Sequence, residues 1–339
     1  ADVSGQMRIA VFLMALFYSG YVMGLELSGE PVQPITPLPV DFRKAALGKQ
    51  LFFDVRLSRD HSISCAHCHD LKERGGADGL KHSFGVDALE GSVNSPTVFN
   101  AALNFAQFWD GRAATLEEQI EGPVTAHAEM AASWPDVLKS LAADIPYRND
   151  FLRLYATGLT VTNIKHAIAE FERTLVTPDS RFDRYLLGDK LAISAAEKHG
   201  YALFKSYGCV ACHQGRNVGG NLFQVLGVMA DYFADHPGEN STSRGRFNVT
   251  GLDEDMHRFK VPSLRLAVLT APYFHDGSAK SLAEAIRTMS KYQLGRNIPD
   301  ADVRSIIAFL YTLPGRYDGH ALEPEDREQM IFSPSTEAP

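Results

Sequence analysis

Two stretches of the sequence decide the fold: CAHCH at residues 65–69 and CVACH at residues 209–213. Each has the C-x-x-C-H spacing, in which two thiols can form thioether bonds to one haem while the adjacent histidine reaches its iron. All four cysteines of the chain lie in these two motifs. The predicted attachment residues for two haems are Cys65, Cys68, His69, Cys209, Cys212 and His213.

Zinc and disulfides are the alternative interpretations of four cysteines. Two C-x-x-C pairs can hold a zinc ion, but such a site gives no reason for a histidine directly after the second cysteine of both pairs. The sequence therefore favours two covalent c-type haems.

A short helical pattern ending in Leu-Phe precedes each motif, at residues 42–54 and at residues 194–208. The second opens with Ser194 and carries Glu197 three positions later, which is a capping box. Two copies of helix, loop and motif indicate a mainly α fold of two cytochrome c-like domains, each binding one covalent haem, with long loops between helices. Apolar residues at helical spacing predict further helices at residues 116–123, 134–145, 162–176, 281–292 and 301–313.

The chain divides into four parts on these patterns. An apolar run at residues 9–25 lies in length between a signal-peptide core and a membrane span, so residues 1–28 are expected to be a secretory signal peptide or an N-terminal inner-membrane anchor. Residues 29–180 and 181–317 are the two haem domains, and residues 318–339 are a C-terminal extension. Both interpretations of the first part place the haem domains in the periplasm.

Composition and charge restrict the partners. The chain is 45% hydrophobic and 22% charged, which is typical of a globular protein. Its formal net charge of -8 argues against a nucleic-acid partner, because phosphate binding needs a basic surface. A cationic soluble protein is a better partner.

Several motifs resemble the bacterial dihaem cytochrome c peroxidase family, which includes the MauG-like enzymes. They are GGADG, SFG and NSPTVFNAALNFAQFWDGRAATLEEQ within residues 75–119, GPV at 122–124, EM at 129–130, LTAPYFHDG at 269–277 and SLAEAIRTM at 281–289. The resemblance covers residues 38–317. It implies that the N-terminal haem is peroxidatic and that the C-terminal haem has a high potential and receives the electrons.

The same resemblance assigns the iron ligands. His69 would be the proximal ligand of the peroxidatic haem, and His213 that of the electron-transfer haem. Met289, fourteen residues after His275, would be the sixth ligand of the latter haem, where MauG-like enzymes carry tyrosine. A methionine on an amphipathic helix is by itself more typical of core packing, and Tyr292 is a nearby alternative ligand.

The resemblance also assigns a distal site for peroxide. Peroxide cleavage needs a base that moves a proton from one oxygen to the other, and a polar group that holds the molecule. Glu129 matches the base, Gln119 the polar group, and Pro123 the residue that shapes the pocket. Trp109 matches a tryptophan that lies between the two haems.

Calcium is a further implied cofactor. Asn94, Thr270 and Pro272 match an inter-domain calcium site, the last two through carbonyl oxygens, which suits a hard cation.

Three further residues are candidates for contact with the haem propionates or with the iron ligands: His275, Arg112 and Arg265.

One position departs from the family pattern. In resting peroxidases of the family, a loop histidine directly after Ser-x-Gly caps the N-terminal iron until the other haem is reduced. Here that motif is SFG at residues 83–85 and the next residue is Val86, which cannot bind iron. His82 lies nearby and could replace the cap, although a lone loop histidine is commonly solvated.

These observations predict a periplasmic cytochrome c peroxidase. It would reduce hydrogen peroxide to water with electrons from a small c-type cytochrome or a cupredoxin. The alternative is a MauG-like enzyme that oxidises Trp or Tyr residues of a protein substrate through high-valent iron; Val86 favours it and Met289 disfavours it. A pure electron carrier would need a sixth ligand at both irons, and the absence of a ligand at Val86 argues against it. Since family members often form dimers, the resemblance allows a homodimer.

Overall fold

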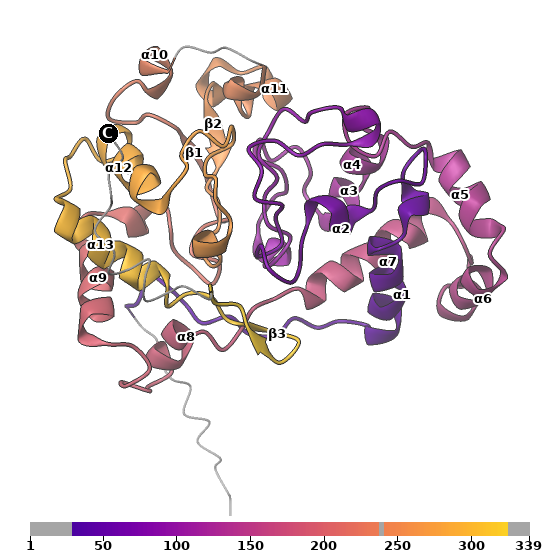
Figure 1. Ribbon diagram of the computed structural model, residues 1–339, viewed down its shortest axis with the longest axis horizontal. Helices are drawn as coiled ribbons and strands as arrows, with labels where there is room; N and C mark the ends of the chain where they lie inside the picture. Colours follow the sequence, from indigo (N-terminus) through magenta and orange to yellow (C-terminus); the bar gives the residue numbers. More distant parts are fainter. Residues whose placement is uncertain (1–28, 237–240, 325–339) are drawn as a thin grey trace, which may run out of the picture.

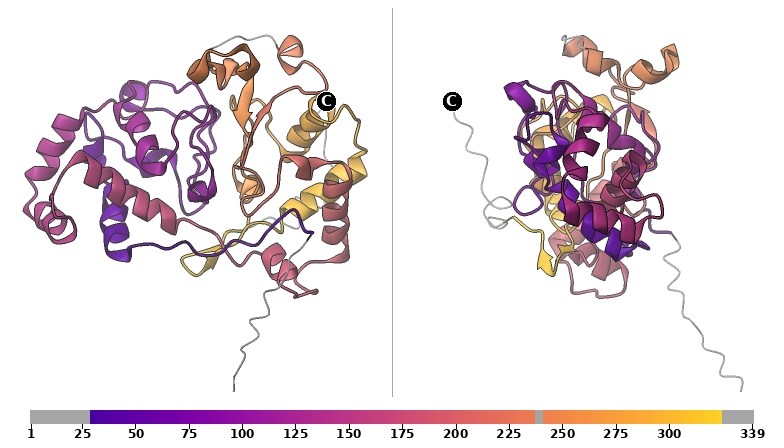
Figure 2. Two further views of the ribbon diagram at one scale, coloured as in Figure 1. Left: turned by 180° about the vertical axis from the view of Figure 1, so that it is seen from behind. Right: turned by 90° about the vertical axis from the view of Figure 1, so that its right-hand side faces the viewer.

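The computed structural model describes residues 29–236 and 241–324, which form two helical lobes side by side (Figure 1). The earlier half of the chain forms one lobe and the later half the other, as the rear view in Figure 2 also shows. The prediction of a mainly α-helical protein is confirmed. The proposed signal peptide or anchor, residues 1–28, lies outside the described residues, as does most of the proposed C-terminal extension.

Helices dominate both lobes, and strands are short. The N-terminal lobe contains α1 (Phe42–Phe52), α2 (Cys65–Cys68), α3 (Leu116–Gln119), α4 (Glu121–Thr125), α5 (Trp134–Ala142), α6 (Ile145–Leu154) and α7 (Val161–Thr174). The C-terminal lobe contains α8 (Arg181–Leu186), α9 (Ala195–Ser206), α10 (Tyr232–Asp235), α11 (Phe247–Thr250), α12 (Leu282–Tyr292) and α13 (Asp300–Leu310). The strands are β1 (Phe223–Val225), β2 (Arg258–Lys260), β3 (Arg316–Tyr317) and β4 (His320–Ala321), which pair antiparallel as β1 with β2 and β3 with β4. Within the described ranges, no helix is long and apolar enough to cross a bilayer.

Each lobe is built on the same crossing of two helices. In the N-terminal lobe α1 packs against α7, and in the C-terminal lobe α9 packs against α13. A glycine allows the close approach at both crossings. A Cβ at Gly48 would lie 1.8 Å from the backbone oxygen of Ala167, and one at Gly200 would lie 1.9 Å from that of Ser305. The repeat predicted from the helical patterns before the two motifs therefore extends to the way these helices pack. The capping box of Ser194 is present as predicted.

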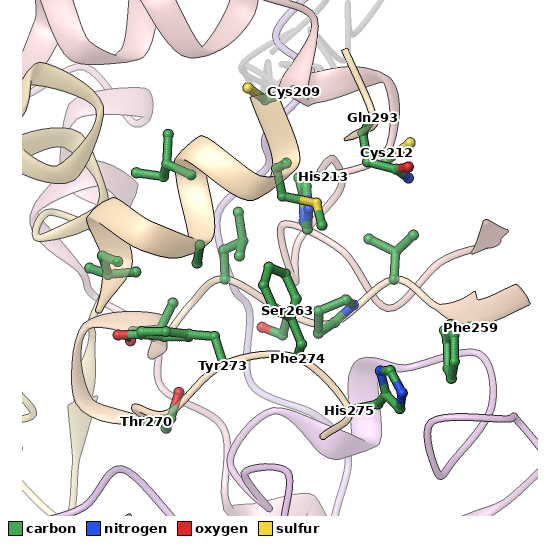
Figure 3. Close-up of a pocket in the computed structure, with 18 of the residues that line it drawn as sticks. Cys209, Cys212, His213, Phe259, Ser263, Thr270, Tyr273, Phe274, His275 and Gln293 are labelled. Carbon is green, nitrogen blue, oxygen red and sulfur yellow. Dashed lines mark hydrogen bonds between the residues drawn. The ribbon is translucent and has the colours of Figure 1, made fainter. Parts of the chain in front are cut away.

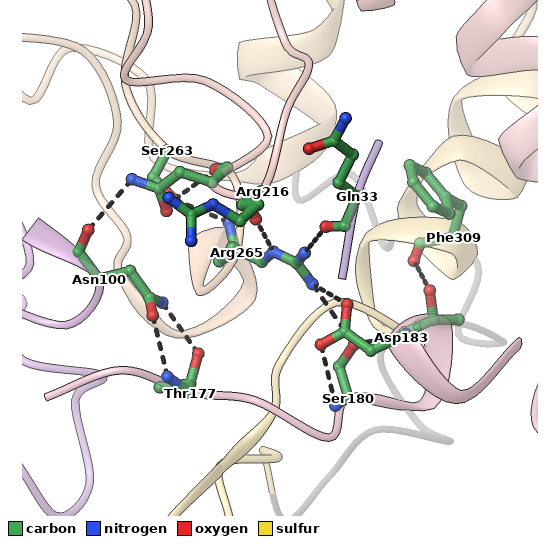
Figure 4. A network of polar contacts seen from close by, with 11 residues as sticks. Gln33, Asn100, Thr177, Ser180, Asp183, Arg216, Ser263, Arg265 and Phe309 are labelled. Atoms are coloured by element: carbon green, nitrogen blue, oxygen red, sulfur yellow. Dashed lines mark hydrogen bonds and ion pairs between the residues drawn. The ribbon is translucent and has the colours of Figure 1, made fainter. Parts of the chain in front are cut away.

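A buried ion pair fixes the start of the C-terminal lobe (Figure 4). Arg265 is fully buried, and its Nη1 lies 2.8 Å from Oδ1 of Asp183 at the start of α8. Its other guanidinium nitrogens donate to the backbone oxygens of Gln33 and Arg216, at 2.6 Å and 2.7 Å. Arg265 therefore joins the N-terminal lead-in to the C-terminal lobe, and its expected role at a haem propionate is not supported.

The chain end that follows α13 returns to the N-terminal lobe. The ring centroid of Tyr317, in β3, lies 4.9 Å from that of Phe99. Leu322 packs in one apolar cluster with Phe52 and Phe171 of the N-terminal lobe and with Leu266 of the C-terminal lobe. The two lobes therefore share buried apolar contacts, and these contacts place the haem motifs relative to each other.

Candidate haem sites

Both motif histidines are held by a backbone carbonyl. His69 follows α2, and its Nδ1 lies 3.1 Å from the backbone oxygen of Gly76. The Nδ1 of His213 lies 3.3 Å from the backbone oxygen of Val218. A carbonyl can only accept, so each Nδ1 carries the proton and each Nε2 keeps a lone pair. This is the arrangement of a histidine that ligates a metal.

The protonation states of the motif histidines suit haem attachment, and the placement of the side chains bears on the zinc alternative. Burial lowers the pKa of His69, and it lowers that of His213 to about 4, so both imidazoles are neutral ligands at pH 7. Burial raises the pKa of Cys65 to about 12 and that of Cys209 to about 11. Among the described residues, no three His, Cys, Asp or Glu side chains gather as a metal site. Two C-x-x-C pairs sharing a zinc ion are therefore excluded.

A cavity of about 260 Å³ contains the second motif (Figure 3). Cys209, Cys212 and His213 line it, and Met289 reaches it from α12. Tyr292, the alternative ligand, does not line the cavity; its hydroxyl donates to a carboxylate oxygen of Asp235 at 2.8 Å. The structure therefore brings Met289, and not Tyr292, to the cavity that holds the motif histidine.

The first motif has a carboxylate nearby. Glu129 lies close enough to Cys68 for its charge to raise the pKa of that thiol. The carboxylate of Glu129 is accessible, yet protein atoms surround it on most sides. The resulting desolvation raises its pKa, although the positive charge of Arg112 acts to lower it. Gln119 ends α3 and Pro123 lies in α4, on the segment that leads to Glu129. Arg112 itself pairs with Asp110 at 3.0 Å.

The loop that contains Val86, at the position of the family's capping histidine, packs against the backbone of Glu129. Val86 is 1% exposed, and its N–H donates to the backbone oxygen of Glu129 at 2.8 Å. The Nδ1 of His82 lies 2.9 Å from Oε1 of Glu90, and its Nε2 is buried without a partner among the described residues. Val86 thus offers no ligand, whereas His82 retains a free ring nitrogen.

Trp109 lies at the contact between the lobes. Its Nε1 donates to the backbone oxygen of Asn94 at 2.9 Å, and its own backbone oxygen accepts from the N–H of Lys260 at 2.8 Å. The N–H of Asn94 in turn donates to the backbone oxygen of His275 at 2.8 Å. Both lobes therefore fix the position of Trp109.

The three residues predicted to bind calcium belong to the wall of the same cavity. Asn94, Thr270 and Pro272 all line it. The amide nitrogen of Asn94 donates to the backbone oxygen of Leu80 at 2.9 Å, which leaves its side-chain oxygen for a cation. Calcium at this point stays a prediction.

Two buried charged residues were missed by sequence reasoning. Lys260 lines the cavity of the second motif, and Glu172 lies on α7 close enough to Cys65 to raise the pKa of that thiol. A lysine between Phe259 and Val261 was the available signal for the first, because a charge inside an apolar stretch is unusual. Glu172 gave no signal, since alternating charges on a helix are typical of a solvated face.

Glu172 makes the stability of the protein depend on pH. Its Oε2 is buried without a partner among the described residues, and burial raises its pKa to about 8, assisted by the charge of Glu117. An unfolded glutamate has a pKa of about 4.3. The folded state therefore binds more protons than the unfolded state between these two values, so stability falls as the pH rises through that window.

Glu172→Gln should therefore raise the free energy of unfolding at pH 8 by about 2–4 kcal/mol and change it little at pH 4.5. Urea unfolding of the holoprotein at the two pH values measures the difference. Glu170→Gln is the matched control, because Glu170 is ion-paired with Arg173 at 2.9 Å and should lose stability instead. An equal effect of Glu172→Gln at both pH values would contradict the prediction.

Comparison with known proteins identifies the family of the chain. Residues 42–191 match the family described as di-haem cytochrome c peroxidase. The chain is 47% identical over 306 residues to cytochrome c peroxidase Ccp of Escherichia coli, covering 89% of this chain and 65% of that protein. It is 44% identical over 308 residues to cytochrome c551 peroxidase of Nitrosomonas europaea, covering 91% of this chain and 90% of that protein.

A solved structure shares the fold. The crystal structure of a MauG-like protein associated with microbial copper homeostasis has a TM-score of 0.72 and 29% identity, over 83% of this chain and 92% of that one. The sequence identity to the two peroxidases is high and extends over most of this chain, which settles the family. The chain belongs to the family of di-haem cytochrome c peroxidase enzymes.

Proposed function

We propose that this protein is a periplasmic dihaem cytochrome c peroxidase, which reduces hydrogen peroxide to water with electrons from a small c-type cytochrome or cupredoxin. The contrast between the two haem sites carries this proposal. Met289 lines the cavity of His213, whereas a carboxylate, Glu129, lies beside the first motif, where Val86 supplies no ligand. One site is thus suited to electron transfer and the other to a small substrate.

The residues present fit two covalent haems. Each lobe offers two cysteines and a neutral histidine whose Nε2 is free, and the cavity around His213 is lined by apolar side chains such as Phe204, Val261 and Leu310. When bound, the haems supply the iron at which the peroxide bond is reduced and the iron that receives electrons. His69 and His213 would hold the two irons, and Cys65, Cys68, Cys209 and Cys212 would hold the porphyrins.

The remaining residues handle protons and positions. The carboxylate of Glu129 accepts a proton from one peroxide oxygen and returns it to the other, which leaves as water. The amide of Gln119 holds the peroxide by a hydrogen bond. Trp109 lies between the lobes, where its ring can relay electrons, and calcium at Asn94, Thr270 and Pro272 would stabilise the lobe contact. Two electrons and two protons convert each peroxide into two waters.

A MauG-like activity is the second candidate. The similarity to a MauG-like structure and the absence of a capping side chain at Val86 favour it. Met289 disfavours it, because a methionine, and not a tyrosine, reaches the second cavity. This activity would require a protein substrate with an exposed Trp or Tyr.

A steady-state assay tests the proposed function. Holoprotein, hydrogen peroxide and a reduced small c-type cytochrome are mixed, and oxidation of the donor is followed by its absorbance. We expect two donor molecules oxidised per peroxide consumed. Peroxide consumption without donor oxidation, accompanied by oxidised Trp or Tyr in an added protein, would support the MauG-like alternative instead.

Met289→His should keep the second haem six-coordinate and lower its reduction potential markedly, since methionine ligation raises the potential. Spectroelectrochemical titration of the holoprotein measures the midpoint. Met256→His, at a methionine that does not line the cavity, is the control and should leave the midpoint unchanged. An unchanged midpoint in Met289→His would remove Met289 from the iron.

A further inference from the structure

Lys260 is a largely buried lysine whose ammonium has no partner among the described residues. It is the last residue of β2 and is 7% exposed. Among the described residues, no carboxylate lies within ion-pair distance of its Nζ and no hydrogen bond to that nitrogen is formed. Burial alone lowers its pKa, to about 8. An unpaired buried ammonium is costly, so such a group is normally paired with an anion.

The cavity that Lys260 lines is otherwise free of ionic groups. In the described part of the chain, its lining contains no Asp, Glu or Arg, and the two histidines, His213 and His275, have lowered pKa values because they are buried. Most of the wall is apolar. The cavity therefore suits a large apolar ligand that carries a negative charge at one edge.

The geometry identifies that edge. Figure 3 shows Phe259 and His275 on the opposite side of the cavity from Cys209 and Cys212. Lys260 directly follows Phe259, whose ring stacks on His275 at 4.4 Å. In a c-type haem the two thioether bonds lie on one edge of the porphyrin and the two propionates on the opposite edge. The propionate edge of a haem held by Cys209 and Cys212 would therefore lie toward the side of the cavity that β2 forms, where Lys260 is part of the wall.

We propose that the Nζ of Lys260 binds a propionate of the C-terminal haem and that its positive charge raises the reduction potential of that haem. The inference rests on the proposed covalent haem at the second motif. A cation near the porphyrin in a low-dielectric site favours the reduced form, which carries one more electron. The backbone N–H of Lys260 donates to the backbone oxygen of Trp109, so the backbone of Lys260 lies at the contact between the lobes.

Substitutions of Lys260 can distinguish an effect of its charge from an effect on the fold, because they keep the backbone hydrogen bond to Trp109. Lys260→Met removes the charge, Lys260→Gln removes it but keeps a hydrogen-bond donor, and Lys260→Arg keeps it. Lys280→Met is the matched control, since Lys280 is an exposed lysine of the same lobe that does not line the cavity. Haem content of each holoprotein is measured first, as the pyridine haemochrome.

Spectroelectrochemical titration then gives the midpoint of the haem that is reduced first. At the wild-type midpoint, the ratio of reduced to oxidised haem should fall about tenfold or more in Lys260→Met and Lys260→Gln, which is about 59 mV for one electron. Lys260→Arg and Lys280→Met should stay close to the wild type. Lys260→Gln decides the question if Lys260→Met loses its haem.

Two results would overturn the inference: unchanged midpoints in both neutral variants, or an equal fall in Lys260→Arg, which would implicate packing and not charge. The proposed function fails separately. A wild type with two haems but without peroxide turnover would refute the peroxidase activity and leave the effect of Lys260 on the midpoint intact.

Discussion

Replacing Glu129 with glutamine should lower the rate of peroxide turnover by about 10²–10⁴-fold, the usual contribution of general acid–base catalysis. Glutamine has nearly the same volume but cannot accept the proton. Both haems should stay attached, because Glu129 is neither an attachment residue nor a partner of the motif histidines. Steady-state rates and haem content of the purified variant give the two values.

The pH profile provides an independent readout for Glu129. A base must be ionised, and desolvation by the surrounding protein atoms raises the pKa of this carboxyl, so wild-type turnover should fall as the pH drops through that raised value. The variant should lose this acid limb. Glu73→Gln, at an exposed glutamate of the same lobe, is the control and should keep both rate and profile. Near-normal turnover of Glu129→Gln would show that another group moves the proton.

The parts of the fold that depend on local spacing could be predicted from the sequence. The two motifs, the helices before them and the capping box at Ser194 are set by residues within one or two turns of each other. The predicted helix at residues 116–123 instead forms two short helices, α3 and α4, so its continuous apolar pattern concealed a change of direction. The repeated helix crossing was not predicted, because the partners of Gly48 and Gly200 are more than a hundred residues away.

Charged residues in the interior were the least predictable. Arg265 was expected near a haem propionate, but Asp183 and two backbone oxygens occupy its guanidinium. Lys260 was overlooked, although it is the lysine that lines the cavity. A sequence shows where a charged residue stands but not which distant groups lie beside it in the fold. Those neighbours determine whether the charge is paired within the protein or is available to a cofactor.

The fully oxidised protein should react with hydrogen peroxide without prior reduction. Val86 stands where the resembling peroxidases place a capping histidine, and its buried side chain has no atom that can ligate iron. Its backbone N–H is bonded to Glu129, so the loop is anchored beside the proposed base and does not have to swing away to expose the site. The resting N-terminal haem should therefore be five-coordinate or water-bound and high-spin.

Stopped-flow mixing of the oxidised holoprotein with peroxide, together with its electron paramagnetic resonance spectrum, measures both properties. His82→Ala is the decisive companion variant, because His82 keeps a free ring nitrogen while Glu90 holds the other. We expect both proteins to be high-spin and to react at once. A low-spin wild type that does not react until it is reduced, together with a His82→Ala variant that reacts immediately, would identify His82 as the cap and refute the interpretation of Val86.

Immediate reaction would leave both oxidising equivalents in the protein before any donor arrives. That condition serves a peroxidase and a MauG-like enzyme alike, so the electron donor assay, and not the speed of this first step, separates the two functions.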